Sequence, residues 1–179
     1  MKTNKLQIYD IAPNFNLLGV DNLKHSLSYF DNVKVLVIMF TCNHCPVVKA
    51  YENRLIKIQD DYKNKSVELV AINSNETLNY PEDSFDKMIV RSNEKSYNFH
   101  YLRDEDQTIA DAYGAERTPE IFAFDQDRKL RYHGRIDDNK DESLVQFHDL
   151  RNAINCILTE TPIENPETTS IGCSIKWLT

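Results

Sequence analysis

The pattern of apolar and polar positions predicts an α/β fold built on one mixed sheet. Residues 33–40 are almost all apolar, which is typical of a strand covered on both faces, and residues 67–73 repeat this pattern. After position 46 apolar side chains recur at helical spacing with charged residues between them; they are Val47, Val48, Tyr51, Leu55, Ile58 and Tyr62. A strand, a helix and a second strand are therefore expected in that order.

Further segments add elements on both sides of this unit. An N-terminal hairpin is predicted over residues 13–29, and a second hairpin over residues 121–133. The other expected helices cover residues 84–97 and 106–113, the second ended by Gly114, followed by a last helix marked by Phe147, Leu150, Ile154 and Ile157. Residues 74–83 are a polar linker and residues 159–179 a polar tail. This order predicts a central mixed sheet flanked by helices.

Length and composition favour one domain over residues 1–179, with the tail 159–179 docking on it. The chain of 179 residues is long enough for one sizeable core, and 41% hydrophobic with 27% charged residues is typical of soluble globular proteins. The net charge of −7, with scattered Lys and Arg, disfavours nucleic acid as a partner. The apolar run 35–40 is too short for a bilayer, and residues 1–7 lack an apolar signal core. We therefore expect no membrane association and a cytoplasmic location, unless a signal peptide has been removed.

Two cysteines stand at the predicted junction of strand and helix. Cys42 and Cys45 are separated by two residues, directly after the apolar run, and Pro46 begins the helix. A thiol at a helix N-terminus is stabilised as the thiolate, which is the form that attacks disulfides. We expect Cys42 to attack, with Thr41 as the helix N-cap, and Cys45 to resolve the mixed disulfide. The pair therefore predicts dithiol chemistry.

A structural disulfide or half of a zinc site is the alternative for this pair. A four-cysteine zinc site needs a second closely spaced pair, whereas Cys156 and Cys173 are 17 residues apart. Cys156 lies beside the apolar face of the last helix and is predicted to pack there. The other histidines share no metal-ligand spacing; they are His25, His100, His133 and His148. We expect no resident metal and no cofactor.

The order of strand, Cys-x-x-Cys, helix and a later Thr118-Pro119 before a strand resembles the thioredoxin fold. Residues 12–15, Ala-Pro-Asn-Phe, and the long insert before Asp106 resemble its AhpC/TSA, or redoxin, branch. More narrowly, four segments are similar to a peroxiredoxin-like thioredoxin family with a Cys-Asn-His-Cys-Pro active site; they are residues 42–49, 113–120, 134–139 and 172–177. The matching segments extend from about residue 12 to residue 177.

This resemblance implies a thiol-disulfide role and gives parts to several residues. Thr118 and Pro119 would form a cis-proline loop that faces the dithiol and presents the backbone of Thr118 to an extended substrate; a strand-initiating turn is the alternative. His44 resembles the histidine between the cysteines of DsbA. It is expected to lower the pKa of Cys42 and raise the reduction potential, unless it is an exposed loop histidine. A salt-bridged turn explains three other residues of the matching segments equally well; they are Arg135, Asp137 and Asp138.

The sequence also offers candidates for a proton acceptor and for a third redox thiol. Thioredoxins use a buried acid on the strand before the active site, but residues 35–40 contain none. Glu120 and Glu52 are therefore the candidates, with a solvated charge as the alternative for each. Cys173 is either a third redox thiol or a small apolar residue in a tail that docks through Ile171, Ile175 and Trp177.

The sequence thus predicts a thiol-disulfide oxidoreductase that uses the Cys42/Cys45 couple. Its partners would be a disulfide-containing protein or a small thiol or disulfide, together with an electron donor. A thiol peroxidase is the first alternative, although the peroxiredoxin Thr-x-x-Cys spacing is absent because Met39 stands three residues before Cys42. A metal carrier using Cys42, Cys45 and His44 is the second, since soft thiolates select Cu(I) or Zn.

Overall fold

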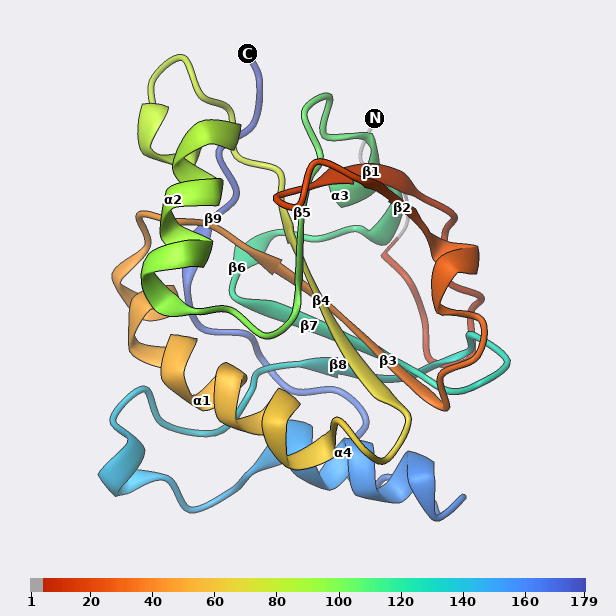
Figure 1. Ribbon diagram of the computed structural model, residues 1–179. Helices are drawn as coiled ribbons and strands as arrows, with labels where there is room; N and C mark the ends of the chain where they lie inside the picture. The colour runs from red at the N-terminus through yellow and green to blue at the C-terminus, as the bar shows by residue number, and fades with distance from the viewer. Residues whose placement is uncertain (1–4) are drawn as a thin grey trace.

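A seven-stranded mixed sheet forms the centre of the molecule (Figure 1). In the computed structural model, which describes residues 5–179, the strands follow the order β2-β1-β5-β4-β3-β7-β8. Their bounds are β1 Asn16–Gly19, β2 Lys24–Ser26, β3 Val35–Thr41, β4 Val67–Asn73, β5 His100–Arg103, β7 Glu120–Phe124 and β8 Leu130–Gly134. Residues 1–4 of the charged N-terminal segment lie outside the described residues.

Strand β3 lies inside this sheet and supports the segment that carries the two cysteines. It runs parallel to β4 and antiparallel to β7, and each of its side chains is buried. Burial on both faces explains its continuous apolar sequence, because a strand with one solvated face would alternate. Its last residue, Thr41, is the register partner of Asn73 at the end of β4. The segments that follow the two strands therefore begin at the same edge of the sheet.

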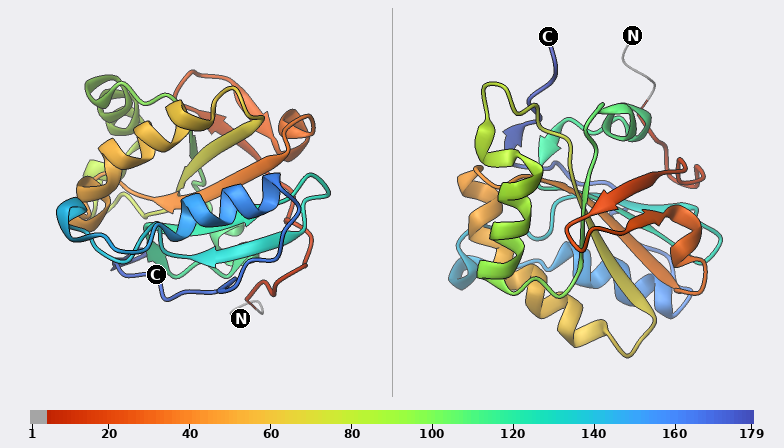
Figure 2. Two further views of the ribbon diagram at one scale, coloured as in Figure 1. Left: turned by 90° about the horizontal axis from the view of Figure 1, so that it is seen from below. Right: turned by 45° about the horizontal axis from the view of Figure 1, so that its top comes forward.

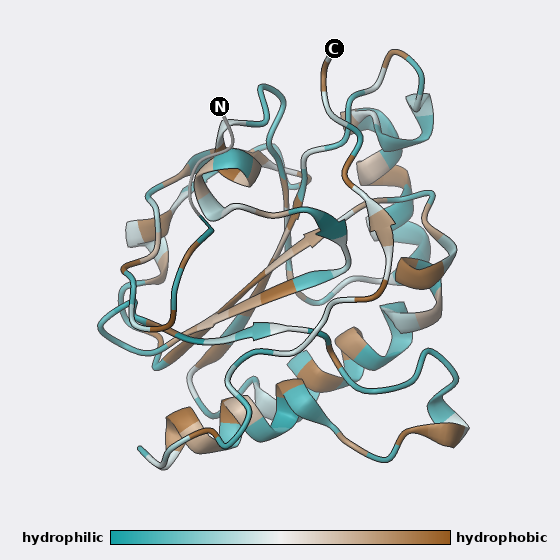
Figure 3. Ribbon diagram, turned by 180° about the vertical axis from the view of Figure 1, so that it is seen from behind, coloured by the Kyte–Doolittle hydropathy of each residue, from teal (hydrophilic) through white to brown (hydrophobic). Residues whose placement is uncertain are grey.

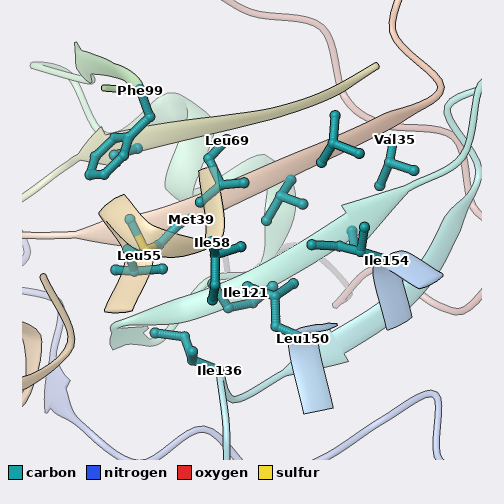
Figure 4. Packing of buried hydrophobic residues seen from close by; sticks show 14 of the residues in the cluster. Val35, Met39, Leu55, Ile58, Leu69, Phe99, Ile121, Ile136, Leu150 and Ile154 are labelled. Atoms are coloured by element: carbon teal, nitrogen blue, oxygen red, sulfur yellow. The ribbon is translucent and has the colours of Figure 1, made fainter. Parts of the chain in front are cut away.

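Helices cover both faces of the sheet. Their bounds are α1 Pro46–Tyr62, α2 Phe85–Lys95, α3 Thr108–Tyr113 and α4 Asp149–Leu158, and short 3-10 turns cover Leu27–Phe30, Pro81–Asp83 and Glu142–Leu144. Helices α1 and α4 lie over one face (Figure 2, left), where their apolar side chains pack against Val35 and Met39 of β3 (Figure 4). Each helix also carries hydrophilic positions (Figure 3), as expected for helices with one face in solvent.

The opposite face of the sheet has its own apolar cluster. Leu36, Ile38 and Phe40 of β3 pack there with Tyr113 of α3 and with Ile175 of the C-terminal tail. Alternate residues of one strand thus enter two separate clusters, because successive side chains point to opposite faces. Strand β3 is therefore held from both sides up to the point where the cysteine segment begins.

The C-terminal tail returns to the edge where β3 and β4 end. Its strand β9, Cys173–Ser174, pairs antiparallel with β6, Arg117–Thr118, outside the main sheet. Ile175 is buried, whereas Ile171 is 67% and Trp177 38% exposed. Of the three side chains expected to dock the tail, only Ile175 is therefore buried.

Most of the predicted elements are confirmed, and the differences concern short segments. The N-terminal hairpin, the β3-α1-β4 unit and the β7-β8 hairpin form where the sequence predicts them. Strand β5 was not predicted, because its four residues include a histidine and an arginine and show no strong apolar pattern. Phe147 precedes α4 and is 63% exposed, so it does not belong to the apolar face of that helix. Over residues 5–179, no helix has both the length and the apolar character needed to cross a membrane.

Candidate active site

The two cysteines lie in the connection between β3 and α1. Cys42 directly follows β3, and Cys45 is the N-cap of α1, with Pro46 as the first helical residue. The exposed fractions are 1% for Cys42 and 0% for Cys45. Proline suits the first helical position because its missing N–H would have had no partner within the helix. The buried strand and the start of the helix thus fix both sulfurs in place.

The helix begins later than the sequence predicts. Thr41 is the last residue of β3, so the prediction of Thr41 as the helix N-cap is wrong. The strand pairing with β4 continues to this residue and leaves the cap to Cys45. Because the field of a helix terminus weakens beyond its first turn, the dipole of α1 acts more strongly on Cys45 than on Cys42.

One negative charge of the dithiol is best accommodated on Cys45. A hydrogen bond from the Cys42 thiol lowers the pKa of Cys45 and raises the pKa of Cys42. Burial opposes ionisation of both groups, but Cys45 also receives hydrogen bonds from the Cys173 thiol and from the N–H groups of Val48 and Cys173, which lower its pKa further. The negative charge of Asp83 raises the pKa of Cys42. These interactions favour the thiolate on Cys45 over the thiolate on Cys42.

The loop before β7 faces both sulfurs. The Thr118-Pro119 peptide bond is cis, as the resemblance implies. Oγ1 of Thr118 lies 3.4 Å from Sγ of Cys42, and its carbonyl oxygen lies 3.5 Å from Sγ of Cys45. Thr118 and Pro119 are buried. The residue before the proline thus contacts the dithiol with both its side chain and its backbone.

His44 is held from two sides. Its Nδ1 lies 2.5 Å from Oδ2 of Asp83, and its ring stacks on Tyr80 with centroids 5.1 Å apart. It is therefore not an unpartnered loop histidine. One ring nitrogen, a carboxylate oxygen of Asp83 and Sγ of Cys42 lie within 4.8 Å of one another. A thiol, an imidazole and a carboxylate in this arrangement can transfer a proton or hold a soft metal ion.

Asp83 is a site residue that the sequence interpretation missed. It ends the turn Pro81–Asp83, inside the segment predicted to be a polar linker, and its exposed fraction is 0%. Its carboxylate accepts hydrogen bonds from the N–H of Asn43 at 2.6 Å and from the amides of Asn73 and Asn75 at 3.2 and 2.9 Å. The sequence did contain one signal for a polar site here, because asparagines stand at or just after the ends of β3 and β4. Parallel strands bring their carboxyl ends to the same edge of a sheet, so these amides could be expected to meet there.

Glu52, one of the two predicted proton acceptors, is occupied by an ion pair between two helices. Its carboxylate accepts hydrogen bonds from Nε of Arg91 and from the hydroxyl of Tyr97, both at 2.8 Å. Glu52 lies on α1 and Arg91 on α2, and Glu52 is only 2% exposed. Glu52 is therefore not a solvated charge. Its hydrogen bonds go to Arg91 and Tyr97 and not to the cysteine sulfurs, so the carboxylate connects the two helices.

Glu120, the other predicted acceptor, supports the loop that carries Thr118. One carboxylate oxygen lies 2.7 Å from Nε2 of His133, and the other accepts the N–H groups of Glu116 and Arg117 at 2.7 and 2.8 Å. Burial raises the pKa of Glu120, but these hydrogen bonds outweigh burial and the pKa is lowered overall. The carboxylate thus binds the backbone directly before Thr118 and holds this part of the loop in place.

Cys173 lies against the dithiol, while Cys156 does not. Sγ of Cys173 is 2.6 Å from Sγ of Cys45, and its side chain packs against the cluster formed by Cys42, Cys45 and Val48. Cys173 is partly exposed, unlike either member of the dithiol. Cys156 lies on α4, partly exposed, with Asn152 of the same helix as its hydrogen-bond partner at 3.9 Å.

The segment that follows β8 contacts α1 through Asp137. Asp137 is buried and accepts hydrogen bonds from the hydroxyl of Tyr51 at 2.9 Å and from Nη1 of Arg54 at 2.7 Å. Arg135 binds Asp149 at 2.8 Å. These contacts agree with the salt-bridged turn proposed for this segment in the sequence analysis. Those of Asp137 also stabilise α1, whose N-cap is Cys45.

Two histidines that are distant in the sequence meet at the β2 edge of the sheet. The ring centroids of His25 and His100 are 4.6 Å apart, and Nε2 of His25 lies 2.8 Å from Oδ2 of Asp21. Sequence spacing missed this cluster because β1 pairs with both β2 and β5, the strands that bring the two histidines together.

Comparison with known proteins gives one family and several related structures. Residues 8–154 match the family described as Redoxin. An uncharacterized conserved protein from Geobacillus kaustophilus is 39% identical, with a TM-score of 0.92 over 98% of this chain and 94% of that one. A hypothetical protein from Sinorhizobium meliloti 1021 is 33% identical, with a TM-score of 0.93 over 98% of this chain and 97% of that one. No curated protein matches the chain.

A more distant structure supports the fold alone. The thioredoxin domain of a thiol-disulfide oxidoreductase from Bacteroides vulgatus has a TM-score of 0.61 at 16% identity, over 70% of this chain and 86% of that one. The chain therefore has a thioredoxin-like α/β fold, with a mixed central sheet flanked by helices and an N-terminal hairpin.

Proposed function

Because the chain belongs to the Redoxin family, we propose that it is a thiol-disulfide oxidoreductase that uses the Cys42/Cys45 couple and a mixed-disulfide intermediate. The observation that carries this proposal is the position of two buried cysteines at the start of α1, where Thr118 of the cis Thr118-Pro119 loop contacts both sulfurs. The substrate is a disulfide in a protein or a small molecule, and a separate donor restores the dithiol.

The charge distribution supports an order of events that reverses the roles predicted from the sequence. The Cys45 thiolate attacks one sulfur of the substrate disulfide, the substrate S–S bond breaks, and the leaving thiolate takes up a proton. Cys42 then loses its proton and attacks Cys45, which releases the second substrate thiolate. The Cys42–Cys45 disulfide forms, and two electrons have passed to the substrate.

His44 and Asp83 support the second step of this reaction. His44 lies close to Cys42 and is oriented by Asp83, so its imidazole is placed to accept the proton that Cys42 must lose. The hydrogen bonds to Cys45 stabilise the reduced form of the couple. Stabilisation of the reduced form raises the reduction potential relative to a dithiol without these donors.

Trapping the mixed disulfide tests the proposal. In a Cys42→Ser/Cys173→Ser double variant no second thiol can resolve Cys45, so incubation with glutathione disulfide should leave glutathione on Cys45, as read by mass. The Cys45→Ser variant and the Cys42→Ser/Cys173→Ser double variant should lose catalysis of insulin disulfide reduction, whereas Cys156→Ser should retain it. Undiminished catalysis in Cys45→Ser and in the double variant would refute the proposal. Trapping on Cys42 of a Cys45→Ser/Cys173→Ser variant instead would support the order predicted from the sequence.

The same protein separates this function from a thiol peroxidase. Rapid stoichiometric consumption of hydrogen peroxide by the reduced protein, with a sulfenic acid on one cysteine, would assign peroxidase activity. We expect slow consumption instead, because the Thr-x-x-Cys arrangement is absent and both sulfurs are buried.

Metal binding is a second candidate function, favoured by the proximity of Cys42, His44 and Asp83. A thiolate and an imidazole suit Zn²⁺ or Cu(I). Titration of the reduced protein with Zn²⁺ and with Cu(I), followed by desalting and elemental analysis, tests this candidate. Retention of metal by the parent protein, and its loss in His44→Ala, would support it.

A further inference from the structure

The C-terminal tail occupies the edge at which an extended substrate would pair. Thr118 and Cys173 are register partners in the antiparallel β6-β9 ladder. Nη1 of Arg117 also donates a hydrogen bond to the carbonyl oxygen of Gly172 at 3.1 Å. A strand from another protein cannot pair with Thr118 while the tail lies there. The strand that pairs with Thr118 beside the dithiol is therefore β9 of this chain.

Backbone contacts beyond β9 fix the position of the tail. The carbonyl oxygen of Lys176 accepts hydrogen bonds from the N–H of Glu76 at 2.8 Å and from Nε2 of Gln107 at 2.7 Å. The N–H of Lys176 donates to Oδ1 of Asn75 at 2.9 Å. The strand that carries Cys173 is thus held on both sides, so the position of its sulfur is set by the fold.

Cys45 contacts the other two sulfurs of the site. Its Sγ lies 2.6 Å from Sγ of Cys173, compared with about 2.05 Å for a disulfide bond, and it packs in one buried cluster with Cys42. Cys45 and Cys42 are 0% and 1% exposed, whereas Cys173 is partly exposed. A thiol arriving from solution therefore meets Cys173 before it meets the dithiol.

We propose that Cys173 is a third redox thiol that carries electrons between a thiol in solution and the buried Cys42–Cys45 disulfide. This inference rests on the proposed function and extends it, because it names the route by which the couple is reduced. The external reductant is a small thiol such as glutathione, which does not need to pair with Thr118.

The route has three balanced steps. The Cys173 thiolate first attacks Cys45 of the oxidised couple, so that a Cys45–Cys173 bond forms, the Cys42–Cys45 bond breaks, and Cys42 leaves and takes up a proton. Glutathione then attacks Cys173, and Cys45 leaves as a thiolate. A second glutathione attacks the mixed disulfide on Cys173, and glutathione disulfide leaves. The protein gains two electrons in these last two steps, and two glutathione molecules lose them.

The electrostatics of the site agree with this order. In the reduced protein, burial and the neighbouring Cys45 raise the pKa of Cys173, so that Cys173 keeps its proton. Formation of the Cys42–Cys45 disulfide removes the charge on Cys45, and with it that contribution to the raised pKa. Lys176, which lowers the pKa of Cys173, remains. A larger fraction of Cys173 is then ionised when the couple is oxidised, and the thiolate is the form that the first step needs.

A Cys42→Ser/Cys156→Ser variant tests the contact directly, since Cys45 and Cys173 are then the remaining thiols. We expect glutathione disulfide to convert it to a monomer with an internal Cys45–Cys173 disulfide, detected as a linked peptide after alkylation. Glutathione left on Cys45 beside an alkylated Cys173 would overturn the inference. If this variant does not fold, the kinetics of the next experiment decide the question.

Reduction kinetics in otherwise unaltered protein provide the second test. In Cys173→Ser, glutathione should reduce the Cys42–Cys45 disulfide about tenfold more slowly, or slower still. The reason is that glutathione must then attack from solution in place of Cys173, which already contacts Cys45. Cys156→Ser is the matched control and should reduce at the parent rate. Equal rates in the parent protein and Cys173→Ser would overturn this inference alone. Failure of the parent protein to form any Cys42–Cys45 disulfide would overturn the proposed function as well.

Discussion

One buried carboxylate contributes to the ionisation of the dithiol. Moving a charge such as that of Asp83 out of water costs several kcal/mol unless hydrogen bonds compensate for the lost water. Here the donors are the N–H of Asn43, the amides of Asn73 and Asn75, and His44. The same charge raises the pKa of Cys42 and so helps to leave the proton there. Asp83 thus influences which of the two sulfurs is ionised.

Replacement of Asp83 by asparagine removes this charge at nearly constant shape. In a Cys45→Ser background, Asp83→Asn should lower the pKa of Cys42, measured as thiolate absorbance against pH. Chemical unfolding should show a loss of about 1–3 kcal/mol, because an amide cannot accept all of these hydrogen bonds. Asp86→Asn, an exposed change on α2, is the matched control. An unchanged titration of Cys42 would contradict the electrostatic role.

The residues found from the sequence are those with a distinctive local context. Cys42, His44 and Cys45 form one motif between a strand and a helix, and the fold places them together. Asp83 belongs to a separate segment that resembles any exposed polar linker, and only the packing of β3 beside β4 brings it to the site. The N-cap was misplaced because the end of a strand depends on its neighbours, which local sequence does not specify.

At the scale of elements, the β6-β9 pairing holds the tail against the dithiol. Burial of an isoleucine side chain such as Ile175 contributes about 1.5–3 kcal/mol, and each hydrogen bond about 1 kcal/mol net. These contributions favour the docked tail and oppose the conformational entropy that it would gain on release. Gly172 permits the close approach of the tail to β6, because a Cβ at this position would lie 2.1 Å from the carbonyl oxygen of Thr118.

A Gly172→Ala substitution should therefore weaken the docking of the tail. The added methyl cannot fit against Thr118, so β9 must shift and expose the dithiol. We expect the reduced variant to react with iodoacetamide at Cys42 and Cys45 about tenfold faster than the parent protein, which corresponds to about 1.4 kcal/mol of lost docking.

Ile171→Ala is the matched control, because Ile171 is the neighbouring residue and is largely exposed. Mass analysis of the alkylated peptides separates the two cysteines of the dithiol from Cys173. Equal rates in Gly172→Ala and in the parent protein would show that the tail does not shield the dithiol.

Long periodic elements could be predicted from the sequence, and short paired ones could not. Strands β3 and β4 and helix α1 have unbroken patterns over 7, 7 and 17 residues. Strands β6 and β9 contain two residues each, and β5 contains four. Such segments become strands because tertiary contacts supply their partners, so a local pattern cannot indicate them. The contact between Cys173 and Cys45 depends on one of these short ladders.

At the scale of the whole molecule, two apolar clusters enclose one sheet, and a polar pair connects β7 to β8. Glu120 and His133 are 3% exposed each and lie 2.7 Å apart. A carboxylate that is stabilised only in the folded state makes the stability of the molecule depend on pH. Since Glu120 also accepts two N–H groups of the β6 segment, acid should weaken the support of the loop that carries Thr118.

A Glu120→Gln variant tests this coupling between protonation and folding. The pKa of Glu120 lies below its ordinary value of 4.5 in the folded protein, so its stabilisation is complete above that pH and is lost as the pH falls through the folded value. At neutral pH the variant should be less stable than the parent protein by about 1–3 kcal/mol in chemical unfolding, because it loses a charge-assisted hydrogen bond. Below pH 4.5 the difference should shrink, since the parent carboxylate then becomes protonated as well. Glu94→Gln, an exposed change on α2, should follow the parent protein at every pH. If Glu120→Gln slowed disulfide reduction without altering stability, Glu120 would instead be the proton acceptor that the sequence predicts.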